Sequence, residues 1–102
     1  MSVKVSFAAR ADVDRIIDHY LRDANQGVAD AFIDAWQAVL ALLDEHPEVG
    51  SLRLERLLDR RGLRVWQAGR FPYLIVYTAI DGVAHVHRVV HAARDTHHAW
   101  NE

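Results

Sequence analysis

The chain has 102 residues, of which 51% are apolar and 25% are charged, as expected for one soluble globular domain spanning residues 1–102. It contains no cysteine, so disulfides and thiolate metal sites are excluded. The first ten residues lack the pattern of a signal peptide, and no apolar run approaches the roughly 18 residues that span a bilayer. We therefore expect no membrane partner and a cytoplasmic location.

The net charge of −2 conceals an asymmetry between the two halves of the chain. Residues 1–50 hold four basic and nine acidic side chains, whereas residues 51–102 hold eight arginines and five acidic side chains. The N-terminal half is acidic, and the C-terminal half is basic and rich in histidine. Such an asymmetry either arises by chance or marks two faces with different partners.

The N-terminal segment predicts a strand followed by a helix. Residues 2–7 alternate, with Val3, Val5 and Phe7 on one side, which is the pattern of a short, half-buried strand. Apolar residues then recur at three- and four-residue steps and fill one stripe of a helix, while charged residues such as Asp12 fall outside it. The stripe consists of Val13, Ile16, Ile17, Tyr20 and Leu21.

Residues 25–27 interrupt this pattern, and Gly27 is expected to take the left-handed conformation that ends a helix. A second helix is predicted from about Val28 to Glu45, antiparallel to the first because the break is short. Its apolar arc exceeds the ~100° stripe that a one-sided helix needs. Either this helix touches both the sheet and the first helix, or the spare margin receives a partner protein. That margin consists of Ile33, Trp36 and Leu40.

The second half predicts a surface connection and three strands. Residues 51–61 are arginine-rich and are expected to form a connection with one helical turn. Strands are predicted at Leu63–Gln67, Tyr73–Ile80 and Ala84–His91, and Asp81-Gly82 is a strong signal for a tight hairpin between the last two. The order β-α-α-β-β-β predicts an α+β fold, with a helical hairpin on one face of a mostly antiparallel four-stranded sheet.

Short motifs are spread over nearly the whole chain. The turn Pro47-Glu48-Val49-Gly50 precedes a strand that begins with Gly62-Leu63-Arg64, and Phe71-Pro72-Tyr73 opens the next strand. The last strand runs into a His-x-x-Arg-Asp sequence at residues 91–95, and Trp100 supplies an aromatic residue in the tail. In order and spacing these motifs resemble the toxins of the RelE/ParE superfamily, and more closely its ParE-like branch.

This resemblance implies the toxin component of a type II toxin–antitoxin system of the plasmid stabilisation type, neutralised by a cognate ParD-like antitoxin in a toxin–antitoxin hetero-oligomer. In such systems a disordered antitoxin segment folds over the helical hairpin, so the candidate antitoxin-binding residues are Ile33, Trp36 and Leu40. ParE-like toxins poison DNA gyrase without chemistry of their own, so no catalytic residue, cofactor or metal is expected. The candidate target-contacting residues are Arg64, Arg88, Arg94 and Trp100.

Two alternatives stay open. RelE-like toxins cleave mRNA in the ribosome, which needs a general base, a general acid and cations for the phosphate. The residues suited to that chemistry are Arg88, His91, Arg94 and His98. The slightly acidic net charge disfavours ribosomal RNA binding, and no tyrosine follows Tyr77. The other alternative is an inactive toxin that persists as an antitoxin-binding module.

Alternation along the last predicted strand places His85, His87 and His91 on one face and Arg88 on the other. The three histidines could bind zinc, but no carboxylate or cysteine accompanies them at matching spacing. Arg88 is either a functional cation or a structural ion-pair partner, for which Asp95 is a candidate.

Overall fold

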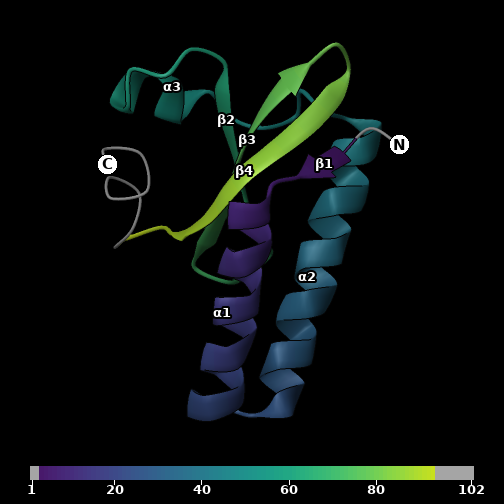
Figure 1. The fold of residues 1–102 in the computed structure, drawn as a ribbon, viewed down its shortest axis with the longest axis vertical. Coiled ribbons are helices and arrows are strands. Elements are labelled where there is room, and N and C mark those ends of the chain that lie inside the picture. The colour runs from purple at the N-terminus through teal and green to yellow at the C-terminus, as the bar shows by residue number, and fades with distance from the viewer. Residues whose placement is uncertain (1–2, 94–102) are drawn as a thin grey trace.

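The described part of the chain folds into three helices and one four-stranded mixed sheet, which confirms the predicted α+β class. The computed structural model describes residues 3–93. The helices are α1 (Phe7–Asp23), α2 (Gln26–Glu45) and α3 (Arg53–Leu57), and the strands are β1 (Val3–Val5), β2 (Leu63–Gln67), β3 (Tyr73–Ile80) and β4 (Val83–His91) (Figure 1). Within the described residues, no helix combines the length and the apolar character needed to cross a membrane.

The strands lie in the order β1-β4-β3-β2. β2, β3 and β4 form an antiparallel meander, and β1 joins the outer edge of β4 in the parallel direction. Asp81 and Gly82 both have positive φ, 53° and 76°, and they connect the paired residues Ile80 and Val83. This confirms the predicted two-residue hairpin, in which both central residues need the left-handed region.

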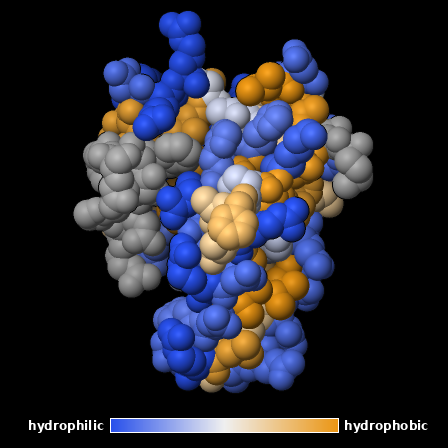
Figure 2. All heavy atoms as spheres, viewed as in Figure 1, coloured by the Kyte–Doolittle hydropathy of each residue, from blue (hydrophilic) through white to orange (hydrophobic). Residues whose placement is uncertain are grey.

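The helical hairpin of α1 and α2 covers one face of the sheet, and α3 lies on the other face (Figure 1). The hairpin-side core is aromatic: Tyr20, Phe32, Phe71 and Tyr73 contact one another with tilted or edge-to-face rings. The core on the α3 side is smaller and aliphatic. It is built from Leu54, Leu63, Val65, Leu74, Val76 and Val90. Figure 2 shows an apolar seam between α1 and α2, framed by polar residues.

The ends of α1 and α2 differ from the sequence prediction. β1 ends at Val5, and Ser6 is the N-cap of α1, so Phe7 starts a helix and its side chain is 88% exposed. The prediction that Phe7 shares the buried side of a strand is therefore wrong. Gly27 is helical, in the first turn of α2, because the Asn25 side chain caps that helix by accepting from the Val28 amide at 3.0 Å. The predicted left-handed Gly27 is also wrong.

A β-bulge interrupts the alternation of β4. Val76 of β3 lies opposite Arg88, whereas its neighbour Tyr77 lies opposite Val86, so His87 is an extra residue in β4. In a regular strand, Val86 and a residue three positions later would face opposite sides. Because of the bulge, Val86 and Val89 are both buried in the hairpin-side core.

The bulge separates the histidines that alternation placed together. His91 contacts the ring of Tyr73 edge to face on the hairpin side, with ring centroids 5.4 Å apart. His87 instead reaches the hydroxyl of Thr78 at 2.8 Å, and Thr78 lies opposite His85 in the ladder. The shared face predicted for His85, His87 and His91 is therefore wrong, since His91 is on the other side of the sheet.

Candidate functional site

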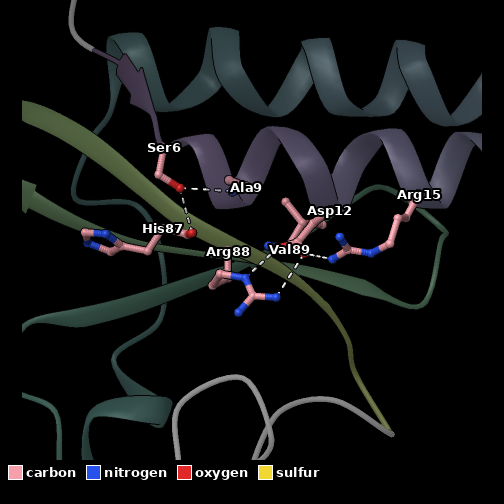
Figure 3. A network of polar contacts seen from close by, with 7 residues as sticks. All are labelled: Ser6, Ala9, Asp12, Arg15, His87, Arg88 and Val89. Atoms are coloured by element: carbon pink, nitrogen blue, oxygen red, sulfur yellow. Dashed lines mark hydrogen bonds and ion pairs between the residues drawn. The ribbon is translucent and has the colours of Figure 1, made fainter. Parts of the chain in front are cut away.

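The outer edge of β4 changes its partner halfway along the strand. β1 pairs only with Ala84–Val86, and from there α1 lies beside the edge (Figure 3). Ser6 makes the transition: its amide donates to the Val86 carbonyl at 2.9 Å, and its hydroxyl donates to the His87 carbonyl at 2.8 Å. The same hydroxyl accepts from the Ala9 amide at 3.0 Å, so one side chain both ends the ladder and caps α1.

Asp12, six residues after Ser6 in the sequence, covers the next part of this edge from α1. Its side chain is 3% exposed, and its Oδ2 accepts from the Val89 amide at 2.9 Å. Arg88 forms a bidentate pair with the same carboxylate, through Nε at 2.8 Å and Nη2 at 3.0 Å, and Arg15 donates to Oδ1. A buried charge is tolerated only when it is paired and hydrogen bonded, and both conditions are met here.

The position of Asp12 corrects the sequence prediction, which placed it outside the buried stripe of α1. On a helix, Asp12 shares a face with Ala9 and Ile16, both of which are buried. In the sequence, an acidic residue at the margin of the apolar stripe is thus the feature that could have predicted a buried polar contact at Asp12. Asp12 also supplies an ion-pair partner for Arg88, whereas the predicted partner, Asp95, lies outside the described residues.

This pairing limits what Arg88 can do for a target or a substrate. The side chain is 32% exposed, and its guanidinium lies on a carboxylate that offsets its charge. Arg15, 66% exposed, adds a second guanidinium to the same carboxylate. Asp12 thus faces two guanidinium groups, and the Nε and Nη2 groups of Arg88 are already donating to it.

Arg64, another predicted target contact, holds the loop that follows α2. Its Nη1 donates to the carbonyls of Glu48 and Gly50, at 3.0 Å and 2.9 Å. The Gly50 amide donates to the buried Tyr77 hydroxyl at 2.8 Å, and a Cβ on Gly50 would lie 2.5 Å from that oxygen. Burial raises the pKa of Tyr77. These contacts give a structural reason for the glycine of the 47–50 turn and for the arginine at the start of β2.

The remaining nuclease candidates are not assembled by the described residues. The His91 ring contacts Tyr73 edge to face, and its Nδ1 accepts from the Ala93 amide at 3.1 Å. Its side chain leaves β4 on the hairpin side, whereas Arg88 lies opposite Val76 on the other face. Arg94, His98 and Trp100 lie outside the described residues.

Burial shifts the protonation equilibrium of one histidine on β4. The pKa of His87 is lowered, mainly by burial and also by the nearby charge of His85. Between residues 3 and 93, no group of three or more histidine, aspartate or glutamate side chains gathers with the geometry of a metal site.

The predicted antitoxin-binding margin of α2 is partly exposed. Ile33, Trp36 and Leu40 are all of intermediate burial, and Trp36 and Leu40 also pack against the hairpin-side core. Trp36 and Leu40 form one wall of a groove of about 300 Å³ between the two helices and β1. Its other lining residues are Val5, Arg10, Val13 and Asp14. Trp36 and Leu40 therefore pack on the core, as the first explanation offered by the sequence requires, and the second, that the margin receives a partner protein, stays a prediction.

The fold of this chain is similar to that of a solved structure. The structure described as "Chromosomal ParDE TA system from P. aeruginosa" superposes with a TM-score of 0.64 at 22% identity, over 89% of this chain and 95% of that one. Residues 3–96 match the family model of the "ParE toxin of type II toxin-antitoxin system, parDE", and the chain belongs to this family. Among curated proteins there is no match.

Proposed function

We propose that this protein is the active toxin of its pair, that a ParD-like antitoxin neutralises it, and that it inhibits DNA gyrase in the cytoplasm without chemistry of its own. The observation that carries the proposal is the family match over residues 3–96, which spans every helix and strand of the fold. Toxins of the ParE-like branch act by poisoning gyrase, as the sequence resemblance implies.

The arrangement of β4 supports a binding function over mRNA cleavage. A ribonuclease needs an acid, a base and a cation that converge on one phosphate. Here Arg88 is paired with Asp12, and the His91 ring lies on the opposite face of the strand. The net charge of −2 also favours a protein target over ribosomal RNA.

The target contact in this proposal combines the tail with the two arginines of the sheet. Arg94 and Trp100 supply a cation and an aromatic anchor, which are the residue types that dominate the energetics of protein interfaces. Arg64 and Arg88 contribute mainly by fixing the surface beside them, since both donate to groups within the chain.

The antitoxin contact in this proposal is the margin of α2 formed by Ile33, Trp36 and Leu40. Support comes from their partial exposure and from the groove that Trp36 and Leu40 line. An amphipathic helix laid into such a groove would bury these side chains by the helix-in-groove mode of recognition.

A gyrase supercoiling assay with the purified toxin, with and without antitoxin, tests the target. We expect inhibition that the antitoxin reverses. If a folded, growth-arresting toxin leaves gyrase unaffected, the gyrase assignment is wrong, and ribosome-dependent mRNA cleavage becomes the next assay. Antitoxin binding without growth arrest would support the inactive-module alternative.

The antitoxin surface is tested with Ile33→Asp and the matched control Gln37→Asp, which places the same charge at an exposed position of α2. We expect Ile33→Asp to weaken antitoxin binding by at least tenfold, roughly the effect of losing one buried apolar contact. Gln37→Asp should bind normally, and both variants should still inhibit gyrase. Equal antitoxin affinities for the two variants would exclude Ile33 from the interface.

A further inference from the structure

The two long helices border an apolar groove on their outer side. Figure 2 shows an apolar seam between α1 and α2, and a cavity of about 300 Å³ in it is lined by Val13, Trp36 and Leu40. Ile17 and Leu21 follow Val13 at four-residue steps along α1. Each such step turns about 40° around a helix, so the row leaves the core: Val13 is 6% exposed, whereas Leu21 is 49% exposed. Leu21 thus offers a partner an apolar surface that the fold does not bury.

Carboxylates border this groove on both sides. Asp14 lines the cavity, and Asp18 lies four residues further along α1 and three residues before Leu21. On α2, Asp30 lies three residues before Ile33. These three aspartates are exposed, and none of them forms an ion pair with another described residue. The groove therefore has acidic rims whose carboxylates have no cationic partner within residues 3–93.

Basic side chains are few on this surface. α2 contains no lysine, arginine or histidine. Of the arginines of α1, Arg10 lines the cavity, whereas Arg15 donates to the buried Asp12. Arg22 directly follows Leu21 and therefore lies about 100° around the helix from it. A partner that binds in the groove thus meets mainly negative charge.

The shape and the charge of the groove indicate its occupant. The apolar face of a third helix, laid between the two helices, would bury side chains of both walls. Lysine and arginine side chains fit the acidic rims, because their methylene stems cover apolar surface while their charged ends reach the carboxylates. A second copy of this chain fits poorly, because a symmetric contact would bring the same carboxylates together.

We infer that this groove binds a helix of the antitoxin whose apolar face is flanked by lysine or arginine side chains. The inference rests on the proposed antitoxin contact at Ile33, Trp36 and Leu40. It adds Leu21 and the acidic rim of α1 to that contact, and it names the charge of the antitoxin segment that binds there. The rims would then reject an antitoxin whose binding helix has acidic flanks, by repulsion between like charges.

The test measures the affinity of the full chain for the purified antitoxin by titration calorimetry, at about 50 mM and about 500 mM salt. The variant Asp14→Asn/Asp18→Asn removes two rim carboxylates and keeps the shape of the side chains. The matched control Asp34→Asn/Glu45→Gln removes two exposed carboxylates from a different face of α2. We expect the rim variant to lose about fivefold in affinity at the lower salt concentration and the control to stay within about twofold. The higher salt concentration should reduce this difference, because salt screens exposed charges.

A second variant, Leu21→Ala, tests the apolar wall of α1. Because Leu21 is 49% exposed, its truncation should leave the midpoint of urea denaturation nearly unchanged while it removes apolar contact with the antitoxin. We expect a loss of about fivefold in antitoxin affinity. Unlike the loss in the rim variant, this one should be the same at both salt concentrations.

Equal affinities of the rim and control variants would overturn the inference, and so would full affinity of Leu21→Ala. Tighter binding by the rim variant would indicate an acidic antitoxin segment, and self-association that Leu21→Ala abolishes would indicate a second copy; either result overturns the inference. The outcome is separable from that of the proposed contact. Weak binding by Ile33→Asp with normal binding by the rim variant contradicts only this inference. Normal binding by Ile33→Asp with weak binding by the rim variant contradicts only the earlier assignment of Ile33.

Discussion

Along the outer edge of β4, the backbone hydrogen-bonding groups find different partners in the two halves of the strand. Ala84–Val86 pairs with β1 through a regular parallel ladder, so backbone groups of one strand satisfy those of the other. Beyond it, side chains of α1 take over: Ser6 donates to the His87 carbonyl, and Asp12 accepts from the Val89 amide. An exposed sheet edge is a site of unwanted pairing, and here a helix with two polar side chains protects it in place of a strand.

The difference lies in how much each edge depends on single side chains. The ladder is made of main-chain groups, so a surface substitution in β1 leaves its hydrogen bonds in place. The edge covered by α1 depends on one carboxylate, which satisfies the Val89 amide and pairs with Arg88 and Arg15 at once. We therefore expect stability to be sensitive to side-chain identity in α1 and much less so in β1.

The largest effect is expected for Asp12→Ala. This change leaves the Val89 amide without an acceptor and Arg88 without its carboxylate, and it should lower the free energy of unfolding by about 3 kcal/mol. Partial exposure of Arg88 keeps the loss below that of a fully buried pair. Urea denaturation measures it, with Asp14→Ala, an exposed acid on the same helix, as the control. Equal stability of the two variants would refute the special role of Asp12.

A double-mutant cycle with Arg88→Gln isolates the ion pair from the rest of this network. Because Asp12 keeps the Val89 amide and Arg15, Arg88→Gln should cost less than Asp12→Ala, about 2 kcal/mol. The coupling energy between the two positions should be about 1–2 kcal/mol. If the losses in free energy of unfolding are strictly additive, the ion pair between Asp12 and Arg88 contributes no coupling energy to stability.

A smaller effect is expected at the junction between the two kinds of edge. Ser6→Ala removes both the cap on the Ala9 amide and the bond to the His87 carbonyl, and it should cost about 1 kcal/mol in the same denaturation experiment. Ser6→Thr keeps a hydroxyl and should recover most of that loss. If threonine is as damaging as alanine, the hydroxyl is not what matters at this position.

The smallest effect concerns the pH dependence of the bulge. The pKa of His87 is lowered by burial and by His85, so the folded state binds a proton less readily than the unfolded chain does. Stability should therefore be retained above the ordinary histidine pKa of about 6.5 and fall as the pH drops below it. His87→Gln should flatten this part of the profile, and His46→Gln, at an exposed position, should not. An unchanged profile for His87→Gln would show that another group titrates.

Features set by neighbouring residues were predicted well from the sequence. The order of strands and helices follows from apolar periodicity, and the Asp81-Gly82 hairpin follows from the need for two residues with positive φ. The helical turn expected within residues 51–61 is α3. Membership of the ParE toxin family, which the motifs indicated, is likewise confirmed.

Features set by contacts between distant segments were not predicted. Asp12 looked like a solvent-facing acid because its partner, the outer edge of β4, is 77 positions away at Val89. The period-2 rule failed at His87 because a bulge depends on the register with β3, which no single strand encodes. Alternation alone assigns Phe7 to a strand, whereas the Ser6 side chain caps a helix that begins at Phe7.

The parallel pairing of β1 with β4 has a consequence for how the protein is made. The hydrogen bond from Ser6 to His87 joins residues 81 positions apart, so β1 and α1 leave the ribosome long before their partner strand exists. At roughly 5–20 residues per second, translation of that interval takes about 4–16 s. During this time the apolar side of α1 has no sheet to cover. The nascent toxin therefore cannot complete its fold until its last strand has been synthesised.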